Sequence, residues 1–224
     1  MKLLFQVVIG SRPHHEYSMK TWEWWSKKHG FEYVIHSPEV AADEIPAWRK
    51  FDCKDLLEKY DCTVIVDDDT MVSWQCPDFT VGLGSAIAAA PDWGGMGTVA
   101  EYCRLGFEKF GGSFIDPWEY ANTGLMVWPS NGRIAMEEVL NAGTPASGLA
   151  DGDMEQTTVN YVARRHGFKL LSPRCNFSQP LLHRMFGVYQ LPALGDVWHF
   201  NDAKGKNRLP LMENSWRLFQ EKYV

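Results

Sequence analysis

The sequence contains no two cysteines in a Cys-X-X-Cys arrangement, although it has five cysteines. An odd number of cysteines without close pairs argues against a disulfide framework and against a structural zinc site. We therefore expect reduced thiols and a cytoplasmic protein. No apolar run approaches the roughly 20 residues of a membrane-spanning helix. The apolar residues 3–9 are too few for a signal peptide and are typical of a buried strand.

Basic residues are in the minority: 22 Lys and Arg stand against 28 Asp and Glu, which gives a net charge of −6. Without a basic tract, the chain is not expected to bind nucleic acid or an anionic membrane surface. Hydrophobic residues make up 45% and charged residues 22% of the 224 residues. This composition is typical of a globular protein that folds around a core without disulfide or metal cross-links. No internal repeat or linker is evident, so we predict one domain over residues 1–224.

The periodicity of apolar residues predicts an alternation of strands and helices. Strands are predicted at 3–9, 31–36, 62–66, 85–90, 124–128 and 168–171, and helices at 16–29, 47–60, 134–142, 155–166 and 216–223. Residues 93–112 are rich in glycine and predict an irregular segment with one short helix at most. The strand–helix–strand order of the first half predicts an α/β fold with a mostly parallel sheet and crossover helices.

Three consecutive carboxylates, Asp67, Asp68 and Asp69, follow the third predicted strand. Such a cluster is costly without a counter-charge, and it lies at the end of the strand where open α/β sheets bind ligands. Because side chains alternate along an extended segment, we expect Asp67 and Asp69 to point to one side and Asp68 to the other. Two carboxylates on one side suit Mg²⁺ or Mn²⁺, which can bridge to a diphosphate. An acidic turn without a ligand is the alternative interpretation.

A DxD pattern after such a strand is found in two classes of enzyme. Phosphatases of the haloacid dehalogenase type use the first Asp as a nucleophile, but their pattern requires Thr or Val where this sequence has Met71. Their motif also belongs to a strand near the start of the chain, whereas this strand is the third. Nucleotide-sugar glycosyltransferases of the GT-A type are the second class.

Five segments match motifs of the second class in the expected order. They are residues 48–69, 85–92, 120–127, 155–160 and 197–201. The first resembles the helix, strand and DxD motif of GT-A glycosyltransferases, and the others resemble motifs of glycosyltransferase family 8. The sequence departs from that family at Glu155 and Thr157, where the family has Asp, and at residues 199–205, which replace its late His-containing motif. The resemblance implies one GT-A domain with a mixed, mostly parallel sheet flanked by helices.

The resemblance also implies an activity and its metal. A sugar would pass from a nucleoside diphosphate sugar, in the first place a UDP-sugar, to a hydroxyl of a glycan or similar acceptor. Asp67, Asp69 and His199 would hold the metal, and the imidazole shifts the preference from Mg²⁺ toward Mn²⁺. The residues implied to bind the donor are Ser11, Arg12, Lys50, Asp67, Asp68, Asn122 and Lys204. His14 and His15 could join the nucleoside-binding loop, although loop histidines are more often exposed.

The turn that opens the helix at 155–166 holds the catalytic candidates. Acidic residues at a helix start are explained by capping alone, but capping does not explain Gln156 and Asn160 one helical turn apart. The resemblance makes Asp153, Glu155 and Gln156 the candidates. In an inverting enzyme a carboxylate here is the general base, and in a retaining enzyme Gln156 or a neighbour faces the reacting carbon. The sequence leaves both alternatives open.

Two other function classes stay open at this stage. A nucleotidyltransferase or phosphatase would use the Asp triplet for Mg²⁺, and a non-catalytic sugar-binding protein would need aromatic rings but no metal site. Trp118 and Trp128 are the rings that we expect to stack on sugars. The partners of the main interpretation are a nucleotide-sugar donor and a glycan acceptor, without nucleic acid or a membrane span. These motifs do not encode the sugar, the acceptor or the oligomeric state.

Overall fold

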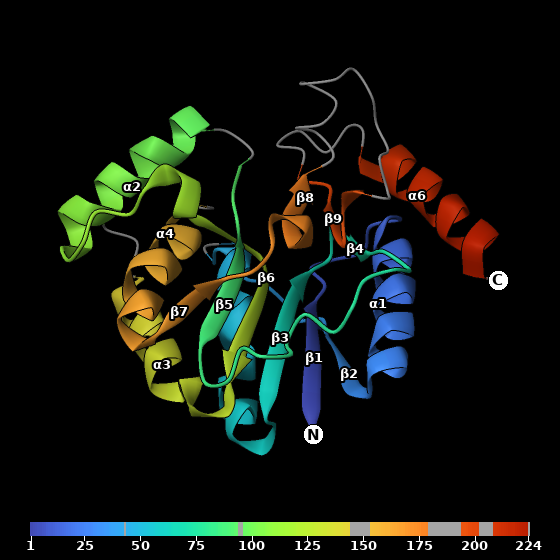
Figure 1. Ribbon diagram of the computed structural model, residues 1–224, viewed down its shortest axis with the longest axis horizontal. Coiled ribbons are helices and arrows are strands. Elements are labelled where there is room, and N and C mark those ends of the chain that lie inside the picture. Colours follow the sequence, from blue (N-terminus) through green and yellow to red (C-terminus); the bar gives the residue numbers. More distant parts are fainter. Residues whose placement is uncertain (43, 94–95, 144–152, 179–193, 202–207, 224) are drawn as a thin grey trace.

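The computed structural model describes residues 1–42, 44–93, 96–143, 153–178, 194–201 and 208–223. Its main sheet has six strands in the order β2-β1-β3-β6-β5-β7. They are β1 (Lys2–Val7), β2 (Phe31–His36), β3 (Cys62–Asp67), β5 (Ile87–Pro91), β6 (Ala121–Pro129) and β7 (Phe168–Leu170). β6 pairs antiparallel with β3 and β5, and the remaining pairs are parallel. The predicted mixed, mostly parallel sheet is confirmed (Figure 1).

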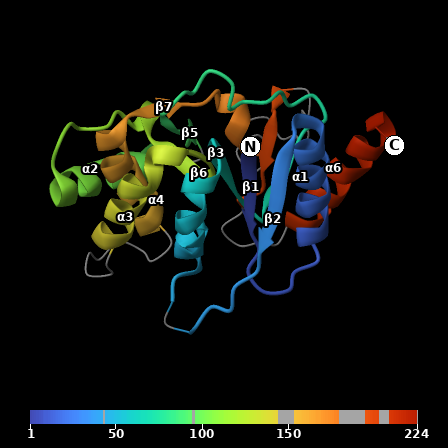
Figure 2. The same cartoon turned by 90° about the horizontal axis from the view of Figure 1, so that it is seen from below.

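Helices connect and cover these strands. The α-helices are α1 (His15–His29), α2 (Met96–Phe110), α3 (Arg133–Ala142), α4 (Asp153–Val162) and α6 (Arg208–Tyr223). The 3-10 helices are η1 (Pro46–Lys59), η2 (Pro117–Glu119), η3 (Ser130–Gly132), η4 (Ala163–His166) and η5 (Pro173–Asn176). Figure 2 shows α2, α3 and α4 gathered at one end of the molecule and α1 and α6 at the other. None of the described helices is long and apolar enough to cross a membrane.

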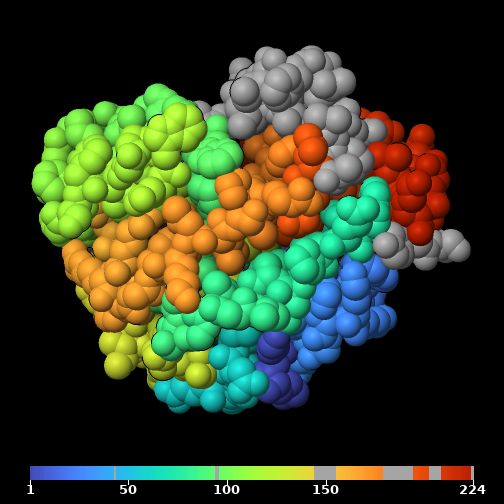
Figure 3. Space-filling view, in the orientation of Figure 1, coloured from blue at the N-terminus to red at the C-terminus, as the bar shows by residue number. Residues whose placement is uncertain are grey.

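The alternation of side chains along the strands builds one hydrophobic core on each face of the main sheet. Leu3 and Phe5 pack on one face against η1, α3 and α4. Leu4 and Val64 pack on the other face against Trp22 of α1. The segment between β4 and β5 crosses this second face, as Figure 3 shows. Because both faces are covered, the strands are nearly continuous apolar runs.

A second, three-stranded sheet lies next to the end of β3 (Figure 1). It consists of β4 (Thr70–Val72), β9 (Val197–His199) and β8 (Phe177–Ser178). β4 and β9 pair antiparallel, with Thr70 opposite His199. Met71 and Trp198 of this sheet pack with Phe219 of α6 in a third core. The pairing brings a late segment of the chain to the residues that follow β3.

Several elements differ from the prediction, and packing explains most of the differences. α2 is a 15-residue helix where an irregular segment with one short helix at most was expected. Its Gly106 is required by packing, because a Cβ atom there would lie 2.2 Å from the ring of Tyr161. α6 begins at Arg208 rather than at Trp216, because Pro210 lies in the first turn, where a missing N–H breaks no helical hydrogen bond. The predicted helix at 47–60 is the 3-10 helix η1. The five cysteines are all in the described residues and are free, as predicted.

Candidate active site

A cleft of about 200 Å³ opens at the carboxyl ends of β1 and β3. Its walls carry the whole Asp triplet, and the cationic side chains among them are Arg12, Lys50 and Arg208. Ile9, directly after β1, adds an apolar patch. Charges of both signs on so small a surface suit a ligand that is itself anionic and is accompanied by a cation. This is the edge of the sheet at which the sequence predicted a ligand.

The side chains of the Asp triplet divide between two directions. Ligand atoms of Asp67, Asp69 and His199 lie within 4.8 Å of one another, whereas Asp68 belongs to another group. The predicted alternation of the three carboxylates is therefore confirmed. The register that sets Thr70 opposite His199 explains why the imidazole arrives here.

Asp69 is a buried carboxylate that remains charged. Burial alone would raise its pKa, but the adjacent His199 and Arg208 hold the pKa below its usual range. His199 Nε2 lies 3.3 Å from Oδ1, and Arg208 Nη2 lies 2.9 Å from Oδ2. Within the described residues Oδ1 has no hydrogen-bond partner. Buried polar atoms are seldom left unpaired, so this oxygen is available to a cation.

The orientation of His199 is fixed by a second hydrogen bond. Its Nδ1 donates to Asn176 Oδ1 at 2.8 Å, and the Asn176 amide is oriented by donating to Pro91 O at 3.0 Å. Nε2 is thereby turned toward Asp69. Metal-binding histidines are commonly oriented in this way, by a hydrogen bond at the ring nitrogen that does not bind the metal. Burial lowers the pKa of His199, but Asp69 raises it more. Two carboxylates and this imidazole fit a divalent cation.

Lys50 connects the Asp triplet to the first turn of α4. It is 6% exposed. Its Nζ lies 3.0 Å from Asp67 Oδ2 and 3.7 Å from Glu155 Oε2, and it donates to Thr123 O at 3.2 Å. Thr123 Oγ1 donates to the same Glu155 oxygen at 2.9 Å. Burial lowers the pKa of Lys50, but Asp67 and Glu155 raise it more, so the ammonium group stays charged.

Asp92, directly after β5, organises the side of the site next to α4. Its Oδ2 accepts hydrogen bonds from Gln156 Nε2 at 2.9 Å and from Asn122 Nδ2 at 3.2 Å. Asn160 holds α4 to β6, because its amide bonds both the N–H and the C=O of Ala121 at 2.8 Å. Gln156 and Asn160, whose spacing capping did not explain, therefore join α4 to the sheet.

The sequence matches no established protein-family profile and no curated protein. Solved structures do match. A glycosyltransferase involved in the glycosylation of the major capsid of PBCV-1 aligns over 95% of this chain and 98% of its own, with a TM-score of 0.62 and 12% identity. The galactosyltransferase LgtC, solved with donor and acceptor sugar analogues, aligns over 96% and 95%, with a TM-score of 0.58 and 12% identity. The glycosyltransferase GlyE of Streptococcus pneumoniae TIGR4 aligns over 99% of this chain and 62% of its own, with a TM-score of 0.59 and 14% identity.

The chain has the GT-A glycosyltransferase fold. The resemblance to family 8 is confirmed at the level of the fold, since LgtC is a member of that family. In this GT-A chain Arg12, Lys50 and Asp68 line the cleft, and Ser11 is exposed nearby. Asn122 is 7% exposed and belongs to the Asp92 network. Two further sequence predictions, Lys204 and the side chain of Asp153, lie outside the described part of the chain.

Two sequence expectations about rings are wrong for this GT-A chain. Trp128 is fully buried and meets Phe51 edge-on at 6.2 Å, so it packs in the core and does not reach a sugar. His14 and His15 are 7% and 4% exposed, because the start of α1 folds onto the end of β3. Trp118, by contrast, is 60% exposed.

Sequence reasoning missed Arg208, Asn176 and Asp92. Asp92 carried the same signal as Asp67, a carboxylate directly after a buried strand, and could have been found by it. Arg208 and Asn176 follow no strand of the main sheet and have no local signature. The GT-A fold brings them to Asp69 and His199 through the second sheet and α6.

Proposed function

We propose that this protein is a metal-dependent glycosyltransferase that transfers a hexose-like sugar from a UDP-sugar to a hydroxyl group of a glycan or similar acceptor. The observation that carries the proposal is the convergence of Asp67, Asp69 and His199 on one point of a cleft in a GT-A fold. Asp69 Oδ1 is buried and has no hydrogen-bond partner among the described residues, which supports a cation there. The structure of LgtC with donor and acceptor sugar analogues supports the same classes of ligand for this chain.

Three residues would hold the metal ion. Asp67 and Asp69 supply carboxylate oxygens and His199 supplies Nε2, a mixed set that favours Mn²⁺ over Mg²⁺. Such an ion, when bound, acts as a Lewis acid toward a diphosphate leaving group. Asn176 contributes by fixing the His199 ring through the 2.8 Å hydrogen bond at Nδ1.

Cationic side chains would offset the remaining charge of the diphosphate. Arg12 and Arg208 both line the cleft, and Arg208 is held at 2.9 Å from Asp69 Oδ2. We assign the nucleoside to the side of the cleft formed by the loop after β1, with Ser11, Arg12 and Asp68. Lys204, which lies outside the described residues, stays a proposed donor-binding residue.

The first turn of α4 would face the reacting centre. Gln156 is partly exposed, and its amide is fixed by the 2.9 Å hydrogen bond to Asp92, which suits a group that contacts the reacting carbon or hydroxyl. Glu155 is 1% exposed and lies 3.7 Å from Lys50, so we assign it a positioning role that acts through Lys50. Asp153 begins α4 and stays a candidate general base. Asn122 would hold Asp92 in place.

Calorimetry with UDP tests the proposal. We expect binding in Mn²⁺ that weakens strongly in EDTA, and Asp69→Ala in Mn²⁺ should behave like the unaltered protein in EDTA. Asp55→Asn is the matched control, because the Asp55 side chain is 76% exposed and lies outside the cleft lining. Equal affinity for UDP with and without metal would exclude the metal–diphosphate site. A panel of UDP-sugars with glycan acceptors then measures transfer, and release of inorganic phosphate without transfer would favour a phosphatase.

A further inference from the structure

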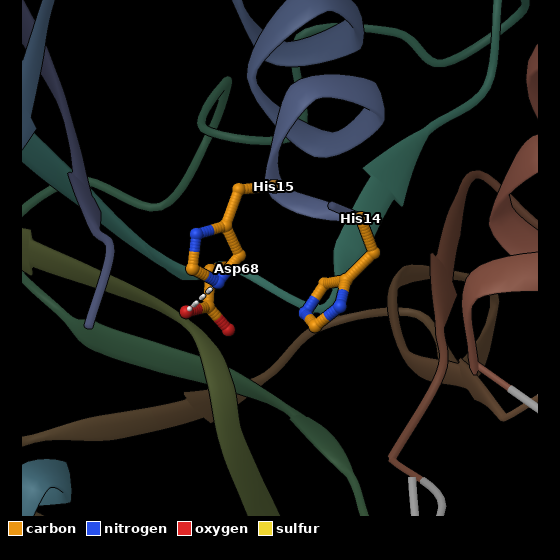
Figure 4. A group of neighbouring side chains, drawn as sticks. All are labelled: His14, His15 and Asp68. Atoms are coloured by element: carbon orange, nitrogen blue, oxygen red, sulfur yellow. Dashed lines mark ion pairs between the residues drawn. The ribbon is translucent and has the colours of Figure 1, made fainter. Parts of the chain in front are cut away.

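A second group of potential ligands lies beside the Asp69 site, and Asp68 is the member of this group that also lines the cleft. Asp68 faces His14 and His15 at the start of α1 (Figure 4). The ligand atoms of these three residues lie within 4.8 Å of one another. They come from the start of the first helix and from the end of β3, so the fold alone brings them together.

Both imidazoles are buried with an unsatisfied nitrogen. His14 is 7% exposed and His15 is 4% exposed. Nε2 of each ring is buried and makes no hydrogen bond within the described part of the chain. An unpaired buried donor or acceptor costs free energy, and native structures hold few of them. Two such atoms in one small space, next to a carboxylate, indicate a ligand.

His15 and Asp68 are placed as two ligands of one cation would be. His15 Nε2 lies 2.9 Å from Asp68 Oδ2, yet the ring is not aligned for a hydrogen bond between them. Ligand atoms that each stand about 2.0–2.2 Å from one cation, at angles of about 90–110°, lie about 2.8–3.6 Å apart. The backbone N–H of Ile9 donates to the same Asp68 oxygen at 3.3 Å. The rings of His14 and His15 are nearly perpendicular, with centroids 4.7 Å apart, so the group is preorganised.

Burial leaves the His14 imidazole available as a neutral ligand. Burial lowers the pKa of His14 to about 4, and His15 and Arg208 act in the same direction, whereas Asp68 and Asp69 oppose them. His14 is therefore neutral at neutral pH. Arg208 is a cation near this group, but its charge is offset by Asp69 at 2.9 Å.

We propose that His14, His15 and Asp68 form a second cation site, separate from the site around Asp69, and that it binds Zn²⁺. Two imidazole nitrogens and one carboxylate oxygen are a ligand set that Zn²⁺ accepts, with water or another oxygen completing the coordination. The Asp69 site has the opposite balance, two carboxylates and one imidazole, and favours a harder cation. The new site joins the loop after β1, which borders the cleft at Arg12, to the end of β3. Bound Zn²⁺ would hold that loop against the Asp triplet.

The test measures metal binding by the EDTA-treated full chain, so it stands apart from the proposed transfer activity. His199→Ala disables the first site, leaves the Asp69–Arg208 ion pair in place, and is the background for all variants. In that background we expect one equivalent of Zn²⁺ by calorimetry, and a Co²⁺ visible spectrum typical of imidazole coordination. His14→Gln and His15→Gln, made singly, should each lower Zn²⁺ affinity by about 100-fold or more. Mutation of a residue that only hydrogen-bonds a metal ligand already lowers metal affinity by about 10–100-fold.

A control variant and two possible results test whether His14, His15 and Asp68 bind Zn²⁺. His166→Gln removes an exposed histidine that faces Glu138 at 2.5 Å, and it should leave Zn²⁺ affinity unchanged. The melting temperature of each metal-free variant shows whether it is folded. If His15→Gln does not fold, the Zn²⁺ affinity of His14→Gln alone tests the proposal. Absence of Zn²⁺ binding in the His199→Ala background would overturn the proposal. Unchanged Zn²⁺ affinity and Co²⁺ spectrum in His14→Gln would overturn it as well.

Discussion

Lys50 Nζ lies 3.0 Å from Asp67 Oδ2, in a place where the lysine is 6% exposed. Hydrogen bonds between charged groups are strong, but burying such a pair is costly, so each partner depends on the other. The same ammonium group lies 3.7 Å from Glu155 on α4. Lys50 therefore links the end of β3 to the helix that faces the proposed reacting centre.

Loss of the Lys50 charge should destabilise the protein. Lys50→Met leaves the buried Glu155 and the half-buried Asp67 without their cation, and we expect the free energy of unfolding to fall by about 3–5 kcal/mol. Lys54→Met on the same 3-10 helix is the control, because the Lys54 side chain is 31% exposed and its Nζ lies 3.9 Å from Glu137. Its cost should stay below about 1 kcal/mol. Urea unfolding in EDTA measures both, and equal values would contradict a structural role for Lys50.

Gly124 should be required for metal binding. A Cβ atom at this position would lie 2.6 Å from His199 Cε1, so Gly124→Ala should displace the ring and weaken Mn²⁺ affinity. Gly97→Ala on α2 is the matched control, because a Cβ atom there meets no described atom within 4 Å. That change should leave Mn²⁺ affinity intact and raise stability by about 0.5–1 kcal/mol. Calorimetry with Mn²⁺ and thermal melts check both variants, and full affinity in Gly124→Ala would show that His199 is not a ligand.

The hydrogen bond behind His199 should tune the same affinity. His199→Ala should remove most Mn²⁺ binding with a small change in the melting temperature of the metal-free protein. Asn176→Ala removes the acceptor at Nδ1 and should weaken Mn²⁺ binding by about 10–100-fold. Asn131→Ala, an exposed asparagine on η3, should change nothing. A large loss of stability in His199→Ala with normal Mn²⁺ affinity would assign His199 to packing instead.

Substitutions of Gln156 and Glu155 should have different effects, the first on turnover and the second on stability. Gln156→Ala removes a group proposed to contact the reacting atoms, so kcat should fall on the order of 10²-fold with UDP binding retained. Glu155→Gln removes a buried partner of Lys50 and should mainly lower the melting temperature. Steady-state kinetics, UDP calorimetry and thermal melts measure the three quantities. Normal turnover in Gln156→Ala would leave that residue only its role in joining α4 to the sheet.

The stability of the metal-free protein should depend on pH through Glu155. Burial raises the pKa of Glu155 from 4.5 to about 6, although Lys50 acts against it. Between these values the folded state keeps a proton that the unfolded state releases, so the free energy of unfolding falls as pH rises through this window. The fall is about 2 kcal/mol, and burial of Asp67 adds to it with the same sign. Urea unfolding in EDTA should show a shallower pH dependence for Glu155→Gln, and an unchanged slope would refute the assignment.

Much of the fold follows from local patterns in the sequence. Apolar runs such as 62–66 become strands because both faces of the sheet are covered, and the alternation of strands and helices leads to parallel pairing. Asp67 and Asp68 point in different directions, as expected of an extended segment, although Asp68 and Asp69 form the turn between β3 and β4. The length of α2 was underestimated because residues 93–112 are rich in glycine, whereas packing against Tyr161 requires the missing side chain of Gly106.

The sequence by itself therefore determined the class of fold, the edge of the sheet that holds the site, and the position of the Asp triplet, since these depend on neighbours along the chain. Only the tertiary structure decided which side chains meet the triplet. Arg208 and Asn176 reach the site through the second sheet and α6, and Lys50 reaches it from a 3-10 helix. His14 and His15 were expected to be exposed loop residues. Their burial, which leaves Nε2 of each ring without a hydrogen bond, is likewise a property of the packed molecule. Local patterns carry no information on long-range contacts of this kind, because no periodicity links residues that only packing brings together.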